Sequence, residues 1–158
     1  MKTLGIDIGT ATTGWAILDK IGSSFKVFGF GVVSTTPKNS MPERLQFIYE
    51  ELSTIIHKYK PLCMAVEELF YFKNKKTVIK VGQARGVVIL AGINRGLFIY
   101  DYTPLQVKQA VTGYGRAEKS QIQNMVKMIL NLKKIPKPDD VADALAIAIC
   151  HLNTRKSV

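Results

Sequence analysis

The chain begins with a short apolar segment, Leu4-Gly5-Ile6-Asp7-Ile8-Gly9, which predicts a buried strand that ends at a turn. Two more segments with strand-like composition follow at residues 13–18 and 25–35, and the connections between the three are short enough for hairpins. Three consecutive antiparallel strands are therefore expected at the start of the fold.

Beyond these strands, helical and strand-like patterns alternate. Ser40-Met41-Pro42-Glu43 has the form of a helix-capping box, and apolar residues continue at helical spacing to about residue 59. The remaining expected elements are strands at 62–67 and 97–102, a loop at 111–116, and helices at 77–94, from Pro104 onward, at 119–132 and at 139–152. Hairpins followed by crossovers predict an α/β fold, in which a mixed five-stranded sheet with its first three strands antiparallel is flanked by helices. We expect a single domain over residues 1–158, with a flexible tail at 153–158.

The basic side chains are concentrated in one half of the sequence. The chain has 22 Lys and Arg against 12 Asp and Glu, a formal net charge of +10. Between Lys58 and Lys137 there are 15 basic and 4 acidic residues, whereas the other 78 residues are close to neutral. Such a concentration of positive charge favours a polyanionic partner, with nucleic acid favoured over a membrane surface.

The sequence lacks the usual features of membrane and secreted proteins. No apolar run approaches the roughly 18–20 residues that a membrane span needs, and Asp7 interrupts the N-terminus before a signal-peptide core is formed. Cys63 and Cys150 each lie in an apolar pattern without metal-binding spacing, so both are expected to be buried, reduced thiols. We therefore expect a cytoplasmic protein that has no membrane contact.

Two carboxylates stand at the ends of predicted strands. Asp7 ends the first strand, and Glu67 follows the apolar segment Cys63-Met64-Ala65-Val66. Open α/β sheets bind ligands at the carboxyl ends of their strands, which makes both residues candidates for a site. The alternatives are structural: Asp7 as a turn former before Gly9, and Glu67 with Glu68 as the exit of the strand into solvent.

The last predicted helix carries two more acids on one face. Asp140 and Asp143 are three residues apart, and Asp143 is the only polar side chain between residues 141 and 150. A helix that is apolar nearly all round is buried, where an ionised carboxylate is costly unless it is paired or bound to a cation. Helix capping explains Asp139 and Asp140 well, but it does not explain Asp143, which lies one turn inside the helix.

A mixed sheet is able to bring Asp7, Glu67, Asp140 and Asp143 to one place. Carboxylates about 4 Å apart repel by roughly 4 kcal/mol at an effective dielectric constant near 20, so such a cluster requires a hard cation. An all-oxygen ligand set favours Mg²⁺ or Mn²⁺, and paired ions of this kind activate a water and stabilise the leaving oxygen of a phosphodiester. Acids at the centre with basic residues around them predict a metal-dependent nuclease.

Six segments along the chain form a recognisable set. They are Gly5-Ile6-Asp7-Ile8-Gly9, Ala65-Val66-Glu67-Glu68-Leu69-Phe70, Gly82-Gln83-Ala84-Arg85-Gly86, Gln106-Val107-Lys108-Gln109, Ala117-Glu118-Lys119-Ser120-Gln121 and Asp140-Val141-Ala142-Asp143-Ala144-Leu145-Ala146. In this order, over essentially the whole chain, they resemble the RuvC family of bacterial Holliday junction resolvases. The departures are small: Ile8 replaces a proline that is common in the family, and some members carry His in place of Asp143.

The resemblance implies an RNase H-like fold and a homodimer that binds a four-way DNA junction. It implies a crossover junction endodeoxyribonuclease that makes two symmetric, Mg²⁺-dependent nicks with ligatable 5′-phosphate ends, in recombination and DNA repair. Family members act with the RuvA and RuvB branch-migration proteins. By motif, the four carboxylates are the catalytic metal ligands of two ions, Phe70 stacks on a base, and Lys108 and Lys119 lie near the cleaved phosphate.

Further basic residues are candidates for contacts with DNA. They are Lys73, Lys75, Lys76, Lys80 and Arg85. Four of them follow the aromatic run at 70–72, and phosphate contacts combined with base stacking suit an opened junction. The alternative is that Tyr71 and Phe72 belong to the core and that the lysines form an ordinary solvated face.

Two other segments have more than one interpretation. Lys133, Lys134 and Lys137 precede the acidic helix and are placed to hold a phosphate backbone, although each is also typical of an ordinary surface. The helix at 77–94 has few bulky side chains, which fits either the packing of two subunits across a twofold axis or packing onto its own sheet. Its small apolar residues are Val78, Val81, Val88 and Ala91.

Two other classes of protein share part of the pattern. Residues 5–10 resemble the phosphate-loop strand of actin-like and sugar-kinase-like nucleotide-binding proteins, but those proteins need two domains, for which 158 residues leave no room. RNase H-like proteins of the YqgF type, some of which process RNA, share the opening motif but not the long match after Glu67. The three classes predict different activities: junction nicking, ATP hydrolysis and RNA cleavage.

Overall fold

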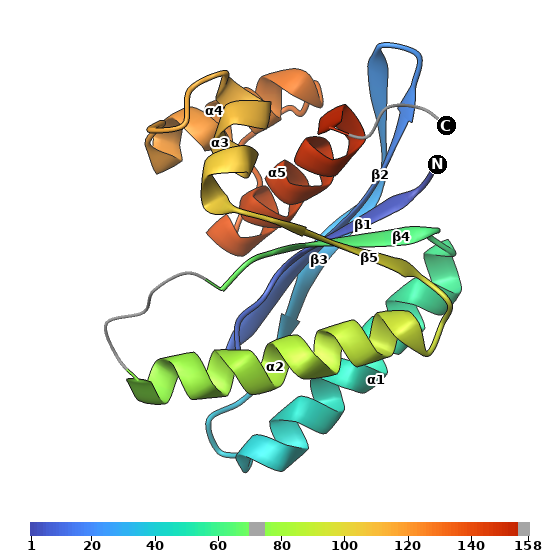
Figure 1. Ribbon diagram of the computed structural model, residues 1–158, viewed down its shortest axis with the longest axis vertical. Coiled ribbons are helices and arrows are strands. Elements are labelled where there is room, and N and C mark those ends of the chain that lie inside the picture. Colours follow the sequence, from blue (N-terminus) through green and yellow to red (C-terminus); the bar gives the residue numbers. More distant parts are fainter. Residues whose placement is uncertain (70–74, 155–158) are drawn as a thin grey trace.

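A mixed five-stranded sheet forms the centre of the structure, a computed structural model that describes residues 1–69 and 75–154 (Figure 1). The strands are β1 (Thr3–Asp7), β2 (Thr12–Ile21), β3 (Ser24–Ser34), β4 (Cys63–Glu67) and β5 (Phe98–Tyr102). They lie in the order β3-β2-β1-β4-β5; β1, β2 and β3 are successively antiparallel, and β1, β4 and β5 are parallel. The predicted mixed sheet is thereby confirmed.

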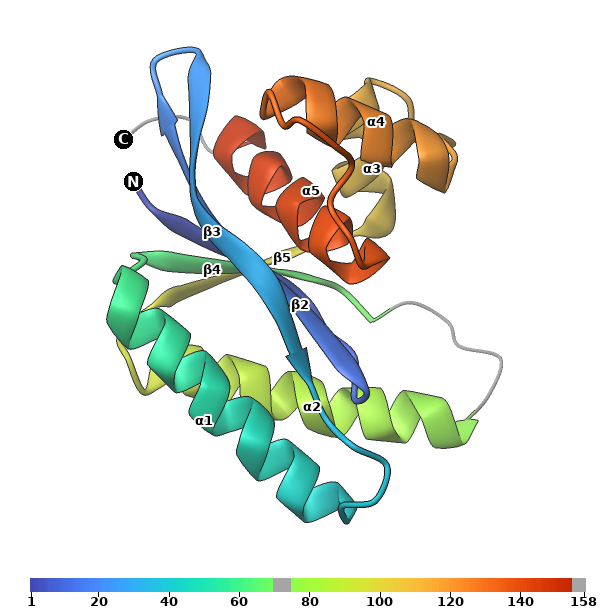
Figure 2. The ribbon, with the colours of Figure 1, turned by 180° about the vertical axis from the view of Figure 1, so that it is seen from behind.

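Helices cover both faces of this sheet. They are α1 (Met41–Tyr59), α2 (Lys75–Ile93), α3 (Pro104–Thr112), α4 (Lys119–Ile129) and α5 (Asp139–Thr154). Figures 1 and 2 show α1 and α2 on one face and α3, α4 and α5 on the other. Along β1, Leu4 and Ile6 belong to the core beneath α1 and α2, whereas Gly5 faces α5, as the alternation of a strand requires.

Helix α5 lies very close to the sheet because glycines face it. A Cβ atom on Gly5 would overlap the backbone oxygen of Ala144, and one on Gly14 would overlap the backbone oxygen of Asp140. Gly14 is the partner of Asp7 on the neighbouring strand β2. This backbone contact fixes the first turns of α5 over the carboxyl end of β1.

Differences from the expected elements lie mainly at helix ends. Helix α3 continues to Thr112 instead of ending before residue 111, because Gly113 caps it in the left-handed conformation with a φ of 74°. Helix α4 ends at Ile129, three residues earlier than predicted, and Asn131 then takes a φ of 49°. A positive φ ends a right-handed helix, and the apolar periodicity alone does not reveal it.

The expected tail needs correction, and the structure decides between the two interpretations of the helix at 77–94. Helix α5 runs to Thr154, so residues 153 and 154 are helical and not part of a flexible tail, while residues 155–158 lie outside the described part of the chain. In α2, Val88 and Ala91 belong to the core between this helix and the protein's own sheet, and Val81 is buried as well. These residues therefore do not form an outer face for a second subunit.

Cys63 and Cys150 are buried and carry free thiols, as predicted. Cys63 Sγ lies 3.3 Å from Thr3 Oγ1 and 3.2 Å from His151 Nε2, and these contacts satisfy polar groups in the interior. Throughout residues 1–69 and 75–154, no helix is both long and apolar enough to cross a membrane.

Candidate active site

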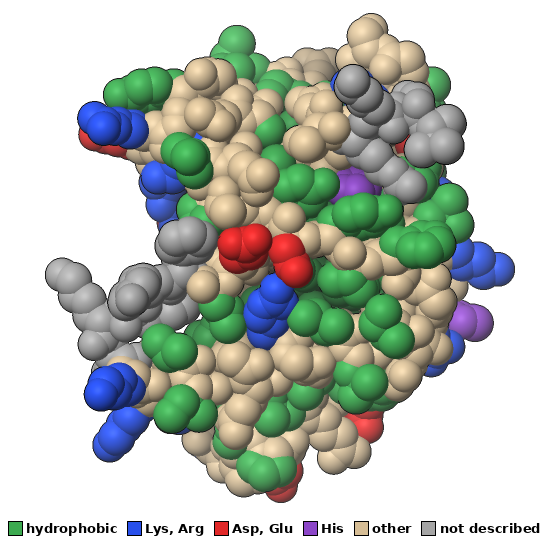
Figure 3. All heavy atoms as spheres, in the orientation of Figure 1, with side chains coloured by type: hydrophobic (Ala, Val, Ile, Leu, Met, Phe, Trp, Pro, Cys, Tyr) green, Lys and Arg blue, Asp and Glu red, His purple; other side chains and the backbone are tan. Residues whose placement is uncertain are grey.

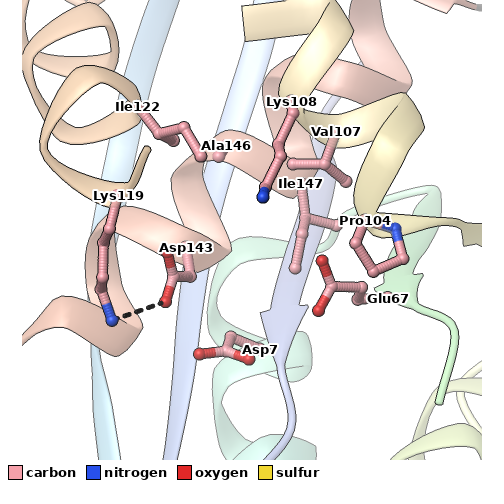
Figure 4. A pocket seen from close by; sticks show the side chains of 10 residues that line it. All are labelled: Asp7, Glu67, Pro104, Val107, Lys108, Lys119, Ile122, Asp143, Ala146 and Ile147. Atoms are coloured by element: carbon pink, nitrogen blue, oxygen red, sulfur yellow. Dashed lines mark ion pairs between the residues drawn. The ribbon is translucent and has the colours of Figure 1, made fainter. Parts of the chain in front are cut away.

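Three of the four predicted carboxylates open onto one cavity at the edge of the sheet (Figure 4). Asp7, Glu67 and Asp143 line this hollow, which has a volume of about 210 Å³. The rest of its wall comes from α3, α4 and α5, through Pro104, Val107, Lys108, Lys119, Ile122, Ala146 and Ile147. Carboxylate and ammonium groups thus share a pocket whose walls are partly apolar.

The topology of the sheet places Asp7 and Glu67 at the same edge. Strands β1 and β4 run parallel with Ile6 opposite Val66. The residues that follow them, Asp7 and Glu67, therefore lie side by side at the carboxyl ends of the two strands. Asp143 approaches from α5, one turn after the helix begins, and is held there by the close contact of that helix with β1 and β2. Residues from both ends of the sequence therefore meet in this pocket.

Asp140 does not line the cavity, although it lies close enough to act on it. Its negative charge raises the pKa of Asp7, and its backbone rests against Gly14. Among the residues that the structure describes, no three acidic, imidazole or thiol side chains stand close enough to hold one ion together. Asp7, Glu67 and Asp143 thus share the pocket without converging on a single point, and Asp140 acts on them from outside it.

Burial and repulsion disfavour ionisation of these acids. Burial, followed by the charges of Asp143, Asp140 and Glu67, raises the pKa of Asp7 from 3.8 to about 7. Burial also raises the pKa of Glu67 and that of Asp143. The pocket therefore concentrates negative charge that the protein compensates only in part.

Two lysines supply this partial compensation. Lys119 Nζ lies 3.7 Å from a carboxylate oxygen of Asp143, the pair drawn in Figure 4, and 3.2 Å from one of Asp139. Burial lowers the pKa of Lys119, but the hydrogen bond to Asp139 and the charges of Asp143, Asp139 and Asp7 outweigh it, so the pKa is raised. Lys108 points toward the pocket from α3, and its charge lowers the pKa of Glu67 against the larger effect of burial.

The donor set of the pocket fits a hard divalent cation. Its acidic side chains offer only oxygen, and no Cys or His is among the described residues that line it. A bound cation neutralises buried negative charge that is otherwise unfavourable. Oxygen ligands of this kind favour Mg²⁺ or Mn²⁺ over zinc.

The other predicted DNA contacts that the structure describes do not line the pocket. Those exposed in the first turns of α2 are Lys75, Lys76 and Lys80. Arg85 forms an ion pair with Asp101 of β5, and its side chain is mostly buried, so it is engaged within the fold. Phe70 and Lys73 lie outside the described residues. Figure 3 shows Lys and Arg side chains along the left margin of the molecule, in both its upper and lower parts.

Two features of the site were not predicted from the sequence. Asp139, expected only as a helix cap, bridges Lys119 at 3.2 Å and Lys137 at 3.0 Å. No pattern marks this bridge, because the acid and Lys119 are far apart in the sequence. Gly14 does carry a signal, since a glycine inside an apolar strand indicates that another backbone comes close.

Comparisons with known proteins agree on one family. Residues 3–151 match the family model for "Crossover junction endodeoxyribonuclease RuvC". A protein of that name from Halothermothrix orenii is 57% identical over 154 residues, which cover 98% of this chain and 93% of the relative. Another, from Caldicellulosiruptor saccharolyticus, is 55% identical over 159 residues, which cover 100% of this chain and 96% of the relative.

A solved structure shows the same arrangement of helices and strands. It is that of Thermus thermophilus RuvC in complex with a Holliday junction substrate. The similarity has a TM-score of 0.93 and 37% sequence identity, and it covers 98% of this chain and 94% of that one.

Proposed function

Because this chain belongs to the RuvC family of crossover junction endodeoxyribonucleases, we propose that it resolves Holliday junctions with two symmetric nicks, leaving ligatable 5′-phosphate ends. The observation that carries this proposal is the pocket in which Asp7, Glu67 and Asp143 meet Lys108 and Lys119. The similarity to a structure that contains a Holliday junction supports the choice of substrate. An RNase H-like enzyme of this kind acts in recombination and DNA repair.

The cofactor in this proposal is Mg²⁺, with Mn²⁺ able to replace it and two ions in each active site. Asp7, Glu67, Asp140 and Asp143 would hold the ions, since the raised pKa values of Asp7, Glu67 and Asp143 mark a site that lacks positive charge. Such ions supply Lewis acidity, which favours deprotonation of a water and offsets charge on the leaving oxygen.

The lysines have a different task from the carboxylates. A phosphodiester carries a negative charge that Asp7, Glu67 and Asp143 repel, so its approach depends on positive charge at the same place. Lys108 and Lys119 provide that charge from α3 and α4, on the side of the pocket away from the strands. Both lysines would bind and orient the phosphate beside the carboxylates.

A cleavage assay on a mobile four-way junction tests the proposed function directly. With Mg²⁺ present we expect paired nicks at symmetric positions, products that DNA ligase seals, and no cleavage of a linear duplex of the same sequence. Chelation of the metal should stop the reaction. Cleavage of RNA, or ATP hydrolysis without nicking, would contradict the proposal and favour one of the alternative classes.

Lys119→Ala is expected to tighten divalent-cation binding by about 3- to 10-fold while slowing cleavage. The reason is that the Lys119 ammonium group already lies beside Asp143 and Asp139, where it opposes the approach of another cation. Mn²⁺ binding measured by titration calorimetry at pH 8, without DNA, checks this prediction. Lys127→Ala is the matched control, because Lys127 lies on the same helix and has no ion pair with a site carboxylate among the described residues. Equal affinities for the wild type and Lys119→Ala would contradict it.

The proposal includes a homodimer that forms through the outer face of α2. Ile79, Leu90 and Ile93 are 64, 51 and 56% exposed, and Gly82 and Gly86 lie between them with open space around both. These five residues follow one another at helical spacing and form a single stripe. An exposed apolar stripe with small residues at its centre allows two copies to approach closely across a twofold axis. A symmetric dimer also supplies the two active sites that two symmetric nicks require.

Leu90→Glu is expected to raise the dimer dissociation constant by at least roughly 100-fold, because it places two like charges without partners in the interface. Sedimentation equilibrium over a range of protein concentrations measures this constant. The control is Met128→Glu, on α4 at the opposite face of the sheet, where the side chain is 71% exposed. A wild-type protein that sediments as a monomer, or a Leu90→Glu variant with an unchanged constant, would be inconsistent with an α2 interface.

Family membership supports four wider proposals. The partners include the RuvA and RuvB branch-migration proteins, and the location is the cytoplasm. Residues 1–158 form one nuclease domain. The contacts to DNA include Phe70, Lys73, Lys75, Lys76 and Lys80, while Arg85 contributes only if its ion pair with Asp101 opens.

A further inference from the structure

A second hollow lies between the edge strand β3 and the connection from α4 to α5. It has a volume of about 300 Å³. We call it the Phe30 hollow, and it is lined by Phe30, Leu132, Lys133, Lys134, Ile135, Pro136 and Lys137. Its floor is apolar and its rim carries three lysines within five residues.

The side chains of the Phe30 hollow are placed for an external ligand. Phe30 is 42% exposed on an edge strand, so its ring is accessible to a ligand. Lys133 and Lys134 are exposed, and neither forms an ion pair with any described residue. Only Lys137 is paired, with Asp139. The hollow therefore combines an apolar surface with uncompensated positive charge.

A continuous row of ion pairs connects the Phe30 hollow to the candidate active site. Lys137 at its rim lies 3.0 Å from Asp139, Asp139 lies 3.2 Å from Lys119, and Lys119 lies 3.7 Å from Asp143 in the carboxylate pocket. The two hollows are thus neighbours. In Figure 2 the connection from α4 to α5 passes over α5, on the face of the sheet opposite α1 and α2.

This placement separates the hollow from the basic residues at the start of α2. Lys75, Lys76 and Lys80 belong to a helix on the other face of the sheet, whereas Lys133, Lys134 and Lys137 lie on the α5 face. Exposed basic residues therefore stand on both faces of the sheet. A nucleic acid strand bound at the pocket extends beyond it. Because the Phe30 hollow is the neighbour of the pocket and carries positive charge, charge complementarity favours a path of the strand along the lysines of this hollow.

We propose that the Phe30 hollow is a second DNA contact, which holds the sugar–phosphate backbone of one duplex arm of the junction next to the cleaved bond. In this interaction Lys133 and Lys134 bind phosphates, and Phe30 packs against deoxyribose. The inference rests on the proposed function and deepens it by naming where an arm lies. Contacts of this kind strengthen binding without sequence preference.

The test compares the double variant Lys133→Gln/Lys134→Gln with a matched control, Lys26→Gln/Lys58→Gln. Both double variants remove two positive charges from the surface. In the control, Lys26 lies opposite Asp19 in the antiparallel pairing of β2 with β3, and Lys58 lies at the end of α1. Both control lysines are at the end of the sheet that is remote from Asp7. Thermal melting verifies that both variants are folded. Binding to a fluorescent four-way junction is then measured by anisotropy at several salt concentrations.

For the hollow variant, the dissociation constant is expected to rise roughly tenfold, and the slope of log K against log[salt] to fall by about 1 to 2. Cleavage at saturating enzyme should stay within twofold of the wild type, because Lys137 and the carboxylate pocket are intact. The loss should also disappear on a junction whose arms are cut too short to reach the hollow. The control variant should bind like the wild type.

Three outcomes would overturn the inference: unchanged affinity and salt slope, an equal loss in the control variant, or an equal loss on short and long arms. If junction binding is unchanged but the variant fails to associate with an acidic partner protein, the hollow is a protein-docking surface instead. A wild-type protein that neither binds nor cleaves the junction refutes the proposed function itself. That result is distinguishable, because the inference concerns only differences from an active wild type.

Discussion

Asp7→Asn is expected to abolish junction cleavage, to leave junction binding intact, and to stabilise the metal-free protein. Asp7 is the last residue of the central strand β1 and faces Glu67 and Asp143 across the pocket. A neutral amide oxygen is a much weaker ligand for a hard cation than a carboxylate, so the cleavage rate should fall on the order of 10³-fold or more. Binding should persist or improve, because one negative charge that repels phosphate is removed.

The gain in stability follows from the raised pKa. In the folded, metal-free protein the pKa of Asp7 is about 7, against 3.8 for the same group without these surroundings. Between these values the folded state holds a proton that the unfolded state has lost, so the free energy of unfolding decreases as pH rises through this window. Above it, the cost of keeping Asp7 ionised in the fold reaches at most about 4 kcal/mol. Asparagine avoids that cost.

Thermal unfolding at pH 5 and pH 8 in the presence of a chelator measures this effect. We expect the variant to melt several degrees above the wild type at pH 8 and to differ much less at pH 5. Added Mg²⁺ should raise the melting temperature of the wild type more than that of the variant. Glu68→Gln is the control, because Glu68 is an exposed acid next to Glu67 that does not line the pocket. A variant that still cleaves the junction, or that melts below the wild type at pH 8, would contradict the proposed role of Asp7 as a buried metal ligand.

Gly14→Ala is expected to lower the free energy of unfolding by about 3 kcal/mol or more and to reduce cleavage by a large factor. The added methyl group would overlap the backbone oxygen of Asp140. Because both groups are fixed to the main chain, no rotation of a side chain relieves this overlap. Helix α5 then has to move away from β2, and it takes Asp140 and Asp143 with it. Stability and activity should therefore be lost together.

Gly31→Ala is the matched control for this prediction. Gly31 lies on β3, and a Cβ atom there would meet only the ring of Trp15, at 3.2 Å. A side chain is able to shift by the few tenths of an ångström required, so the loss should be much smaller. Chemical denaturation gives the two free energies, and the junction assay gives the two rates. Equal effects at the two positions would show that the backbone contact with α5 has no special importance.

The fold was largely predictable because its signals are local. Apolar periodicity and turn residues identified every strand of the sheet, and the capping box at Ser40 placed the start of α1. Helix ends were less accurate, since the termination of α4 depends on the positive φ of Asn131, a residue that is not a strong helix breaker. The partner of the apolar face of α2 was left open between a second subunit and the protein's own sheet, because periodicity identifies an apolar face but not the element that covers it.

The site was predictable in part, for a related reason. An ionised carboxylate is unfavourable at the end of an apolar strand or in a buried helix, so Asp7, Glu67 and Asp143 could be predicted as site residues from the sequence. Their common cavity depends on the order β2-β1-β4, which makes Asp7 and Glu67 neighbours. Lys119 and Asp139 show the limit of this reasoning, since an ion pair between loop-connected helices depends on packing that no sequence spacing records.

The close seating of α5 on Gly5 and Gly14 has a consequence for biosynthesis. Synthesis reaches Asp7 and Glu67 long before it reaches α5, which carries Asp140 and Asp143. A nascent protein that still lacks α5 can thus possess its central strands and most of its basic residues while it lacks two of the four proposed metal ligands. We therefore expect that the growing polypeptide is able to bind DNA before it is able to cleave it.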